Sequence, residues 1–83
     1  MTIRVLLFGH YKDLLTTDGA LLLDDLADGS TVADVAERLA ARDARLANLL
    51  QRTRVAVGGD FAAPETKVRD GDEVAFLPPM SGG

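Results

Sequence analysis

The first apolar positions of the chain follow a period of two. Ile3, Val5 and Leu7 occupy every second position of residues 2–8, and this alternation is typical of a β-strand with one buried face. An Asp-Gly turn signal then precedes a second apolar run at residues 20–26. We predict that the two segments form a hairpin. Three consecutive leucines leave open which face of the second strand points inward.

The middle of the chain has helical spacing instead. Apolar residues recur three and four positions apart from residue 32 to residue 39, which predicts a helix from Val32 to about Arg42. Thr31 stands three residues before Asp34, and this spacing resembles a capping box in which Asp replaces the usual Glu or Gln. We predict a second, shorter helical stretch over residues 43–51.

The last third of the chain predicts three short strands. Residues 54–57 form the first, and the paired glycines behind them suit a two-residue hairpin turn into the next. Residues 73–77 form the last strand, which Pro78-Pro79 ends because proline lacks the donor that a sheet ladder needs.

This order of elements predicts an α+β domain, with a mixed sheet of about five strands packed on one main helix. The first and last strands are the most hydrophobic, so we place them side by side at the centre. The predicted core between sheet and helix consists of Ile3, Val5, Leu7, Val35, Leu39, Val74 and Phe76.

Composition excludes several classes of function. Without cysteine there is no disulfide framework and no thiolate nucleophile, and a single histidine argues against a zinc site. A net charge of −4 argues against nucleic acid, which needs a basic footprint. No apolar run is longer than that at residues 5–8, which is too short for a membrane span, and we expect no secretory signal. At 83 residues we therefore expect one cytoplasmic domain, in which the acidic pairs are solvated turns.

The C-terminal residues have a composition suited to projection from the domain. Pro78 and Pro79 stiffen the exit from the last strand, and Met80 to Gly83 then reach about 13–14 Å at ~3.3–3.6 Å per residue. Two glycines leave no side chain beside the terminal carboxylate, so this end fits a narrow channel. We divide the chain into a domain over residues 1–79 and a tail over residues 80–83. A frayed, inert end is the alternative.

Two segments resemble a known family. Residues 70–83, which read DGDEVAFLPPMSGG, and residues 3–14, which read IRVLLFGHYKDL, are similar to the ends of the MoaD/ThiS family of ubiquitin-like sulfur carriers. The resemblance implies a ubiquitin-like β-grasp fold. It also implies that the chain is no enzyme by itself and binds no cofactor or metal.

The activity implied by the resemblance is sulfur transfer through Gly83. An E1-like adenylating enzyme would use ATP and magnesium to activate the Gly83 carboxylate, and a sulfurtransferase persulfide would convert it to a thiocarboxylate. Ser81 and Gly82 would carry that group into the large subunit of molybdopterin synthase, in a heterotetramer. There the sulfur would build the dithiolene of the molybdenum cofactor.

A partner surface is expected on the strand face opposite the core. Phe8 and Leu77 fall there, where an isolated monomer would favour polar groups, unless a loop or the second helix covers them. The resemblance implies that this face meets the synthase subunit and the activating enzyme. Lys12, at its edge, stands where the family often has arginine, and lysine lacks the bidentate fork. The implied partner-binding set is Phe8, Lys12, Leu77, Pro78, Pro79 and Met80.

Three alternatives stay open at the level of sequence. The carrier could serve another client, such as thiamin thiazole, a tRNA thionucleotide or cysteine. It could be a ubiquitin-like modifier that forms isopeptide bonds, because the activation chemistry is the same. It could also be a β-grasp interaction module with an inert tail, although the Gly-Gly end counts against this reading.

Overall fold

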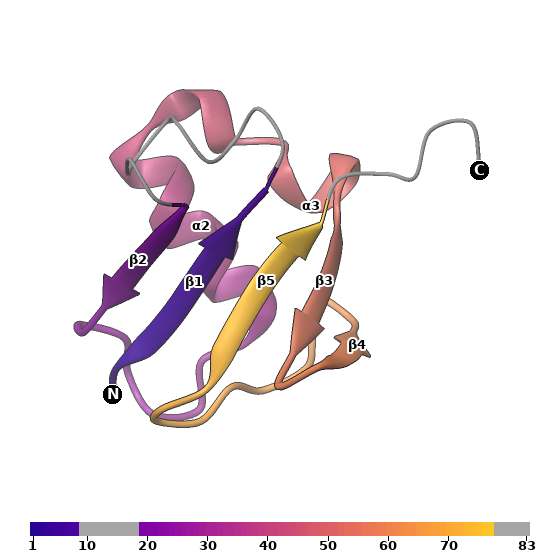
Figure 1. Ribbon diagram of the computed structural model, residues 1–83. Helices are drawn as coiled ribbons and strands as arrows, with labels where there is room; N and C mark the ends of the chain where they lie inside the picture. Colours follow the sequence, from indigo (N-terminus) through magenta and orange to yellow (C-terminus); the bar gives the residue numbers. More distant parts are fainter. Residues whose placement is uncertain (9–18, 78–83) are drawn as a thin grey trace.

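A computed structural model describes residues 1–8 and 19–77 as a single layer of strands covered by helices (Figure 1). The strand and helix order is the predicted one. Along the chain the elements are β1 (Ile3–Leu7), β2 (Ala20–Leu23), α2 (Val32–Arg42), the 3-10 helix η2 (Ala44–Leu46), α3 (Leu49–Arg52), β3 (Arg54–Val57), β4 (Asp60–Ala62) and β5 (Glu73–Leu77).

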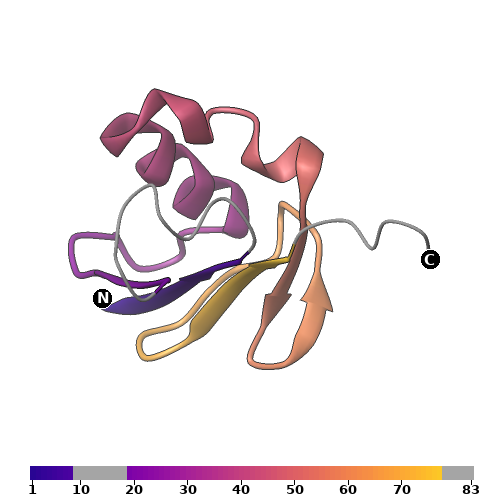
Figure 2. The ribbon, with the colours of Figure 1, turned by 45° about the horizontal axis from the view of Figure 1, so that its top comes forward.

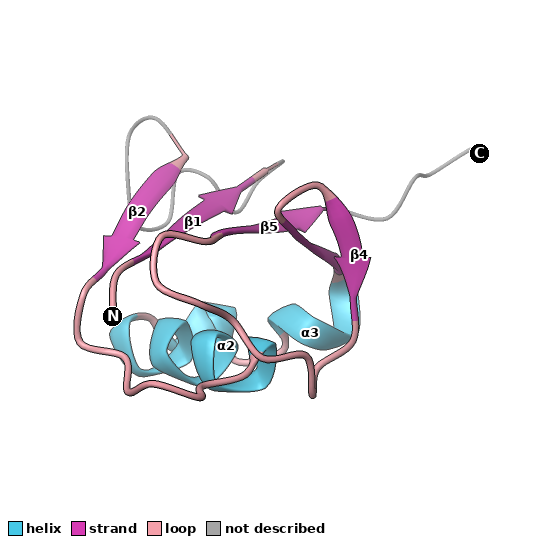
Figure 3. Ribbon diagram, turned by 90° about the horizontal axis from the view of Figure 1, so that it is seen from below, coloured by secondary structure: helices cyan, strands magenta, loops and turns pink. Residues whose placement is uncertain are grey.

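The five strands form one mixed sheet in the order β2-β1-β5-β3-β4. The first and last strands of the chain, β1 and β5, run parallel at its centre, as predicted, and every other neighbouring pair is antiparallel. Figures 2 and 3 show α2 and α3 on the same face of this sheet. The described residues thus form a β-grasp arrangement of two layers, and the other face of the sheet carries no helix.

The main helix begins and ends where the sequence predicts. The Asp34 backbone N–H donates to Thr31 Oγ1 at 3.3 Å, and the Thr31 N–H donates to Asp34 Oδ2 at 2.8 Å, which completes the capping box. At the other end Asp43 has extended backbone angles, so the helix stops at Arg42. A side-chain capping box therefore sets the start of the helix, and the extended backbone of Asp43 marks its end.

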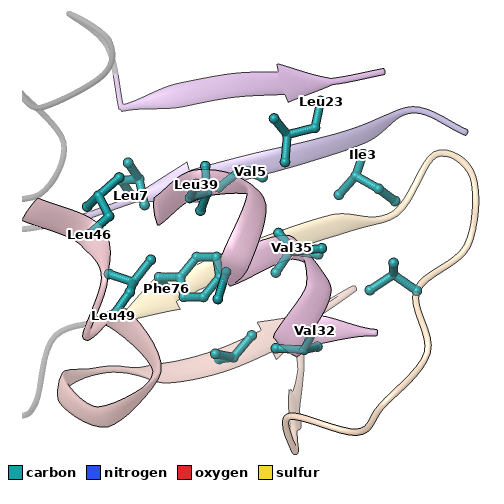
Figure 4. Close-up of a cluster of buried hydrophobic side chains, with 14 of the residues drawn as sticks. Ile3, Val5, Leu7, Leu23, Val32, Val35, Leu39, Leu46, Leu49 and Phe76 are labelled. Atoms are coloured by element: carbon teal, nitrogen blue, oxygen red, sulfur yellow. The ribbon is translucent and has the colours of Figure 1, made fainter. Parts of the chain in front are cut away.

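The core lies between α2 and the inner face of the sheet (Figure 4). All seven residues predicted for it are at most 2% exposed, which confirms that assignment. Phe76 is the largest side chain with no exposure. The remaining buried apolar residues are Leu23, Leu26, Val32, Ala36, Leu46, Leu49, Val55 and Val68.

The second strand is shorter than the sequence suggests, because tertiary contacts take over its end. We predicted residues 20–26, and the strand stops at Leu23. Asp25 then forms an ion pair with Arg38 of α2 at 3.1 Å, and the Leu26 carbonyl accepts a 2.8 Å hydrogen bond from the Met1 amino group. These contacts direct the chain away from β1 and bury the Leu26 side chain.

The predicted helical stretch over residues 43–51 is divided into two short pieces. The Asp43 carboxylate caps η2 by accepting a hydrogen bond from the Arg45 N–H at 2.9 Å. Asn48 then interrupts the helical path before α3. Short polar side chains that bond to nearby backbone favour caps over helix interiors. The division still buries both Leu46 and Leu49 against the core.

The predicted two-residue turn joins β3 to β4. Gly58 and Gly59 have φ angles of 59° and 93°, and Val57 pairs with Asp60 on either side of them. Positive φ at both central residues matches the right-handed twist of the strands and favours glycine. The turn fixes which residues of β4 lie opposite those of β3.

The core assignment predicts unequal effects for the same substitution at two phenylalanines. Phe76→Ala should lower the free energy of unfolding by roughly 3–5 kcal/mol, because it leaves a cavity at a site that is closed to solvent. Phe61→Ala, at a side chain that is 70% exposed, is the matched control and should change it by less than about 0.5 kcal/mol. Chemical denaturation measures both values, and equal losses would contradict the assignment.

Candidate functional site

The sheet face turned away from the helices is the candidate site, and we call it the outer face. Side chains alternate along a strand, so the burial of Val74 and Phe76 turns Ala75 and Leu77 outward. The same alternation turns Leu6 outward from β1. The outer face therefore consists of the strand residues that alternate with the core residues.

Strand register aligns apolar outer-face residues into one row across the whole sheet. Leu6 lies opposite Ala20 on one side and Ala75 on the other, and Ala56 lies opposite both Ala75 and Phe61. The alanines at the middle of the row have small side chains and leave the surface nearly flat, so the backbone of a partner could approach it closely. Phe61 ends the row with an exposed ring. A continuous apolar strip of this kind is typical of an interaction surface.

The predicted partner residues Phe8 and Leu77 lie at one end of this face. Leu7 pairs with Phe76, so the parallel register brings Phe8, just beyond β1, level with Leu77. Phe8 is 40% exposed and Leu77 is half-buried. Its role in partner binding stays a prediction. Lys12 and residues 78–83, including Gly82 and Gly83, lie outside the described residues.

Sequence reasoning missed two side chains on the outer face. Phe61 projects from β4, and the Arg54 guanidinium carbon lies 5.7 Å from the centre of its ring. Leu22, 63% exposed, projects at the opposite end of the face beside Arg4. The two-residue turn held the signal for Phe61, since it sets Phe61 opposite Ala56 on the outer face.

Charges are sparse on this face. Arg4 and Glu73 approach to 3.7 Å and lie opposite each other in adjacent strands, at the end away from Leu77. Both side chains are about half exposed, and such a pair contributes little to stability. At the other end, Arg54 pairs with Leu77 in the ladder and forms no ion pair within residues 1–8 and 19–77.

The acidic pairs were predicted to be solvated turns, and two of their carboxylates also bind backbone N–H groups. The Thr2 N–H donates to Asp70 Oδ1 at 2.6 Å, and the Arg69 N–H donates to Asp72 Oδ2 at 2.7 Å. A hydrogen bond from the Arg45 side chain is the main cause that lowers the pKa of the Asp43 carboxyl. These carboxylates organise backbone, and the described residues contain no cluster of three or more metal-ligating side chains.

No helix in the described part of the chain is long and apolar enough to cross a membrane. The apolar row lies on one face of the sheet, where Leu6, Ala20, Ala56 and Ala75 are half-buried and Phe61 is exposed.

Comparison with known proteins gives a family match and relatives that agree with it. Residues 5–83 match the ThiS family. The chain is 35% identical over 83 residues to the molybdopterin synthase sulfur carrier subunits of Haemophilus influenzae and of Escherichia coli, with 98% of this chain and 99% of each relative covered. Among solved structures, SAMP1 from Haloferax volcanii aligns over 100% of both chains with a TM-score of 0.82 and 23% identity, a likeness that shows the shared fold.

Adjacent leucines in β2 test the division between inner and outer faces. Leu23→Ala should lower the free energy of unfolding by about 2–5 kcal/mol, because this side chain is only 2% exposed. Leu22→Ala removes the same atoms from the outer face and should cost less than about 0.5 kcal/mol. The shift of the urea midpoint reports both costs, and the reverse order would mean that β2 presents its other face to the core.

Proposed function

This chain belongs to the ThiS/MoaD family of small sulfur carriers, and from that premise we propose that it is the sulfur-donating subunit of a molybdopterin synthase. Gly83 is the residue that carries the sulfur. The reaction takes place in the active site of the large synthase subunit. We place this exchange in the cytoplasm, where ATP is available to the activating enzyme.

The observation that carries the proposal is the extent of the family match. The match runs to residue 83 and so includes the Gly82-Gly83 end, and the two curated relatives named as molybdopterin synthase sulfur carriers align along nearly their whole length. The chain has no cysteine that could hold sulfur in another form. The carboxylate of Gly83 is then the group best suited to accept it.

The chemistry requires that the tail be activated elsewhere. A carboxylate is a poor electrophile because its oxygen is a poor leaving group, and adenylation by an E1-like partner with ATP and magnesium makes AMP the leaving group. A persulfide sulfur from a sulfurtransferase then attacks the carbonyl carbon and displaces AMP, which leaves an acyl disulfide. A partner thiol cleaves its S–S bond, so the terminal sulfur stays on Gly83 and the partner sulfurs form a disulfide. The resulting thiocarboxylate passes its sulfur to the pterin precursor bound by the large subunit. This chain supplies the carrier, and its partners supply the nucleophiles and bases.

The outer face gives the carrier a means of docking on these partners. Phe8 and Leu77 sit where β5 ends, and only Pro78 and Pro79 separate Leu77 from the tail in sequence. A partner bound over this end of the sheet would therefore receive the tail directly beside its contact surface. Ser81 and Gly82 have small side chains or none, which suits a narrow channel. Pro78, Pro79 and Met80 would line the entrance, and Lys12 would contribute a charge at the edge.

Deletion of Gly83 should abolish sulfur loading and transfer. The shortened tail loses about 3.3–3.6 Å of reach, so its new carboxylate misses the reactive centre of the activating enzyme. Mass spectrometry after incubation with the E1-like enzyme, ATP, magnesium and a sulfur donor should show an oxygen-for-sulfur exchange in the wild type and none in the deletion variant.

Two further tail variants test the same requirement for a correctly placed carboxylate and a narrow tail. Addition of one residue after Gly83 displaces the carboxylate, and Gly82→Phe obstructs the channel, so both should also fail to transfer sulfur. All three variants should unfold at the wild-type temperature. Dithiolene formation by the deletion variant would refute the sulfur-carrier function. Covalent ladders on other proteins, without any thiocarboxylate, would favour a ubiquitin-like modifier.

Phe8→Ala should weaken binding to the large synthase subunit by about 2 kcal/mol or more, roughly thirtyfold in Kd, as expected for a buried aromatic anchor. Leu22→Ala is the control, because it truncates an exposed apolar side chain at the far end of the same face. Isothermal titration calorimetry gives both affinities. Wild-type affinity of the Phe8 variant would remove this end of the outer face from the docking surface.

A further inference from the structure

Arg54 holds an unusual position on the outer face. Its ladder partner is Leu77, the last residue of β5, and its guanidinium lies over the Phe61 ring on the neighbouring strand. The negative face of an aromatic ring attracts a cation, which favours this placement of the guanidinium. The charge is thereby positioned at the end of the sheet from which the tail departs.

The charge of Arg54 lacks a counterion within the described residues. The other outer-face arginine, Arg4, is neutralised by Glu73. Arg54 forms no ion pair with any residue that the structure describes, in a chain whose net charge is −4. A guanidinium that enters an interface without an acceptor loses hydration and gains nothing in return. A partner that covers this end of the sheet must therefore provide an acceptor.

A groove beside Arg54 adds a second requirement. It has a volume of about 310 Å³ and opens between α3, the start of β3 and β4. Apolar residues contribute to its walls: Leu50, Val55, Phe61, Ala62 and Pro64. Thr53 also lines it, and its hydroxyl already donates to the Leu49 carbonyl at 2.7 Å. Among the described residues of the lining, Arg54 is the only charged one.

We propose that Arg54 and this groove bind a partner segment that presents an apolar side chain next to a carboxylate. The apolar side chain fills the groove, and the carboxylate accepts hydrogen bonds from the guanidinium fork. This inference rests on the proposed function, since the partner is the large synthase subunit. It adds the chemistry by which that subunit recognises this end of the sheet.

The contact between Arg54 and the partner carboxylate would also set the direction in which the partner docks. Apolar contact along the outer face is non-directional, so the row of Leu6, Ala75 and Ala56 accepts a partner in either sense. Among the described residues of the outer face, Arg54 carries a charge with no ion-pair partner, and this breaks the symmetry because only one orientation brings a carboxylate to it. Complementary charges of this type contribute specificity and register at an interface.

Charge reversal at Arg54 tests the proposal against a matched control. Arg54→Glu should raise the Kd for the large subunit at least about tenfold, Arg54→Met about threefold or more, and Arg54→Lys less than Arg54→Met. Arg52→Glu makes the same change in net charge at an exposed residue of α3 and should stay within about twofold of the wild type. Calorimetry at two salt concentrations should show a weaker salt dependence for Arg54→Met than for the wild type.

Equal effects of Arg54→Glu and Arg52→Glu would overturn the proposal, because only general charge would then matter. Reversal of one partner carboxylate to lysine should restore binding of Arg54→Glu, and a scan of the partner's acidic residues that finds no such rescue would also overturn it. Self-association of the free chain that Arg54→Glu abolishes would assign the groove to a second copy instead. Failure of the wild-type chain to bind the large subunit would refute the proposed function, a separate result.

Discussion

β1 and β5 run parallel at the centre of the sheet, with Val5 opposite Val74 and Leu7 opposite Phe76. Parallel neighbours need a crossover between them, and here the crossover contains β2, the helices and the β3–β4 hairpin. This one pairing therefore closes the domain and supports its most deeply buried side chains. It also brings Phe8 beside Leu77, so the start of the chain and the root of the tail meet at the same end of the sheet.

The alternation of side chains divides each central strand between two functions. In β5, Val74 and Phe76 stabilise the core, whereas Ala75 and Leu77 face away from it. Because the two sets do not share neighbours, a change on the outer face has little effect on stability. The sheet can thus present apolar residues to a partner without weakening the fold that holds them. A domain this small has few residues to spare, so this double use of strands is an efficient solution.

Local chemistry explains which parts of the fold the sequence predicts well. The bounds of α2 follow from its helical period and from the Thr31–Asp34 capping box, which lie within a few residues of one another. The predicted end of β2 was wrong because the observed end depends on contacts between residues distant in sequence. These are the ion pair of Asp25 with Arg38 and the hydrogen bond of the Leu26 carbonyl with the N-terminus. Alternation alone placed Phe8 and Leu77 on the outer face. The placement of Phe61 on the outer face depends on the register between β3 and β4. The placement of the Arg54 guanidinium depends on its packing over the Phe61 ring. The sulfur-carrying role proposed for Gly83 rests on the family resemblance, because the interactions of the described residues do not bear on it.

A carrier of this kind depends on orientation as much as on affinity. Since the chain leads from Leu77, the end of β5, to the tail, a partner bound in the reverse sense would place its active site at the Arg4–Glu73 end of the sheet. Affinity from the apolar row would be similar in both senses, yet only one of them delivers a carboxylate to the reacting centre. Among the described residues, Arg4 forms an ion pair with Glu73 at one end and Arg54 has no ion-pair partner at the other, so the two ends of the outer face differ electrostatically. This asymmetry gives a nearly flat apolar surface the direction that group transfer through a short tail requires.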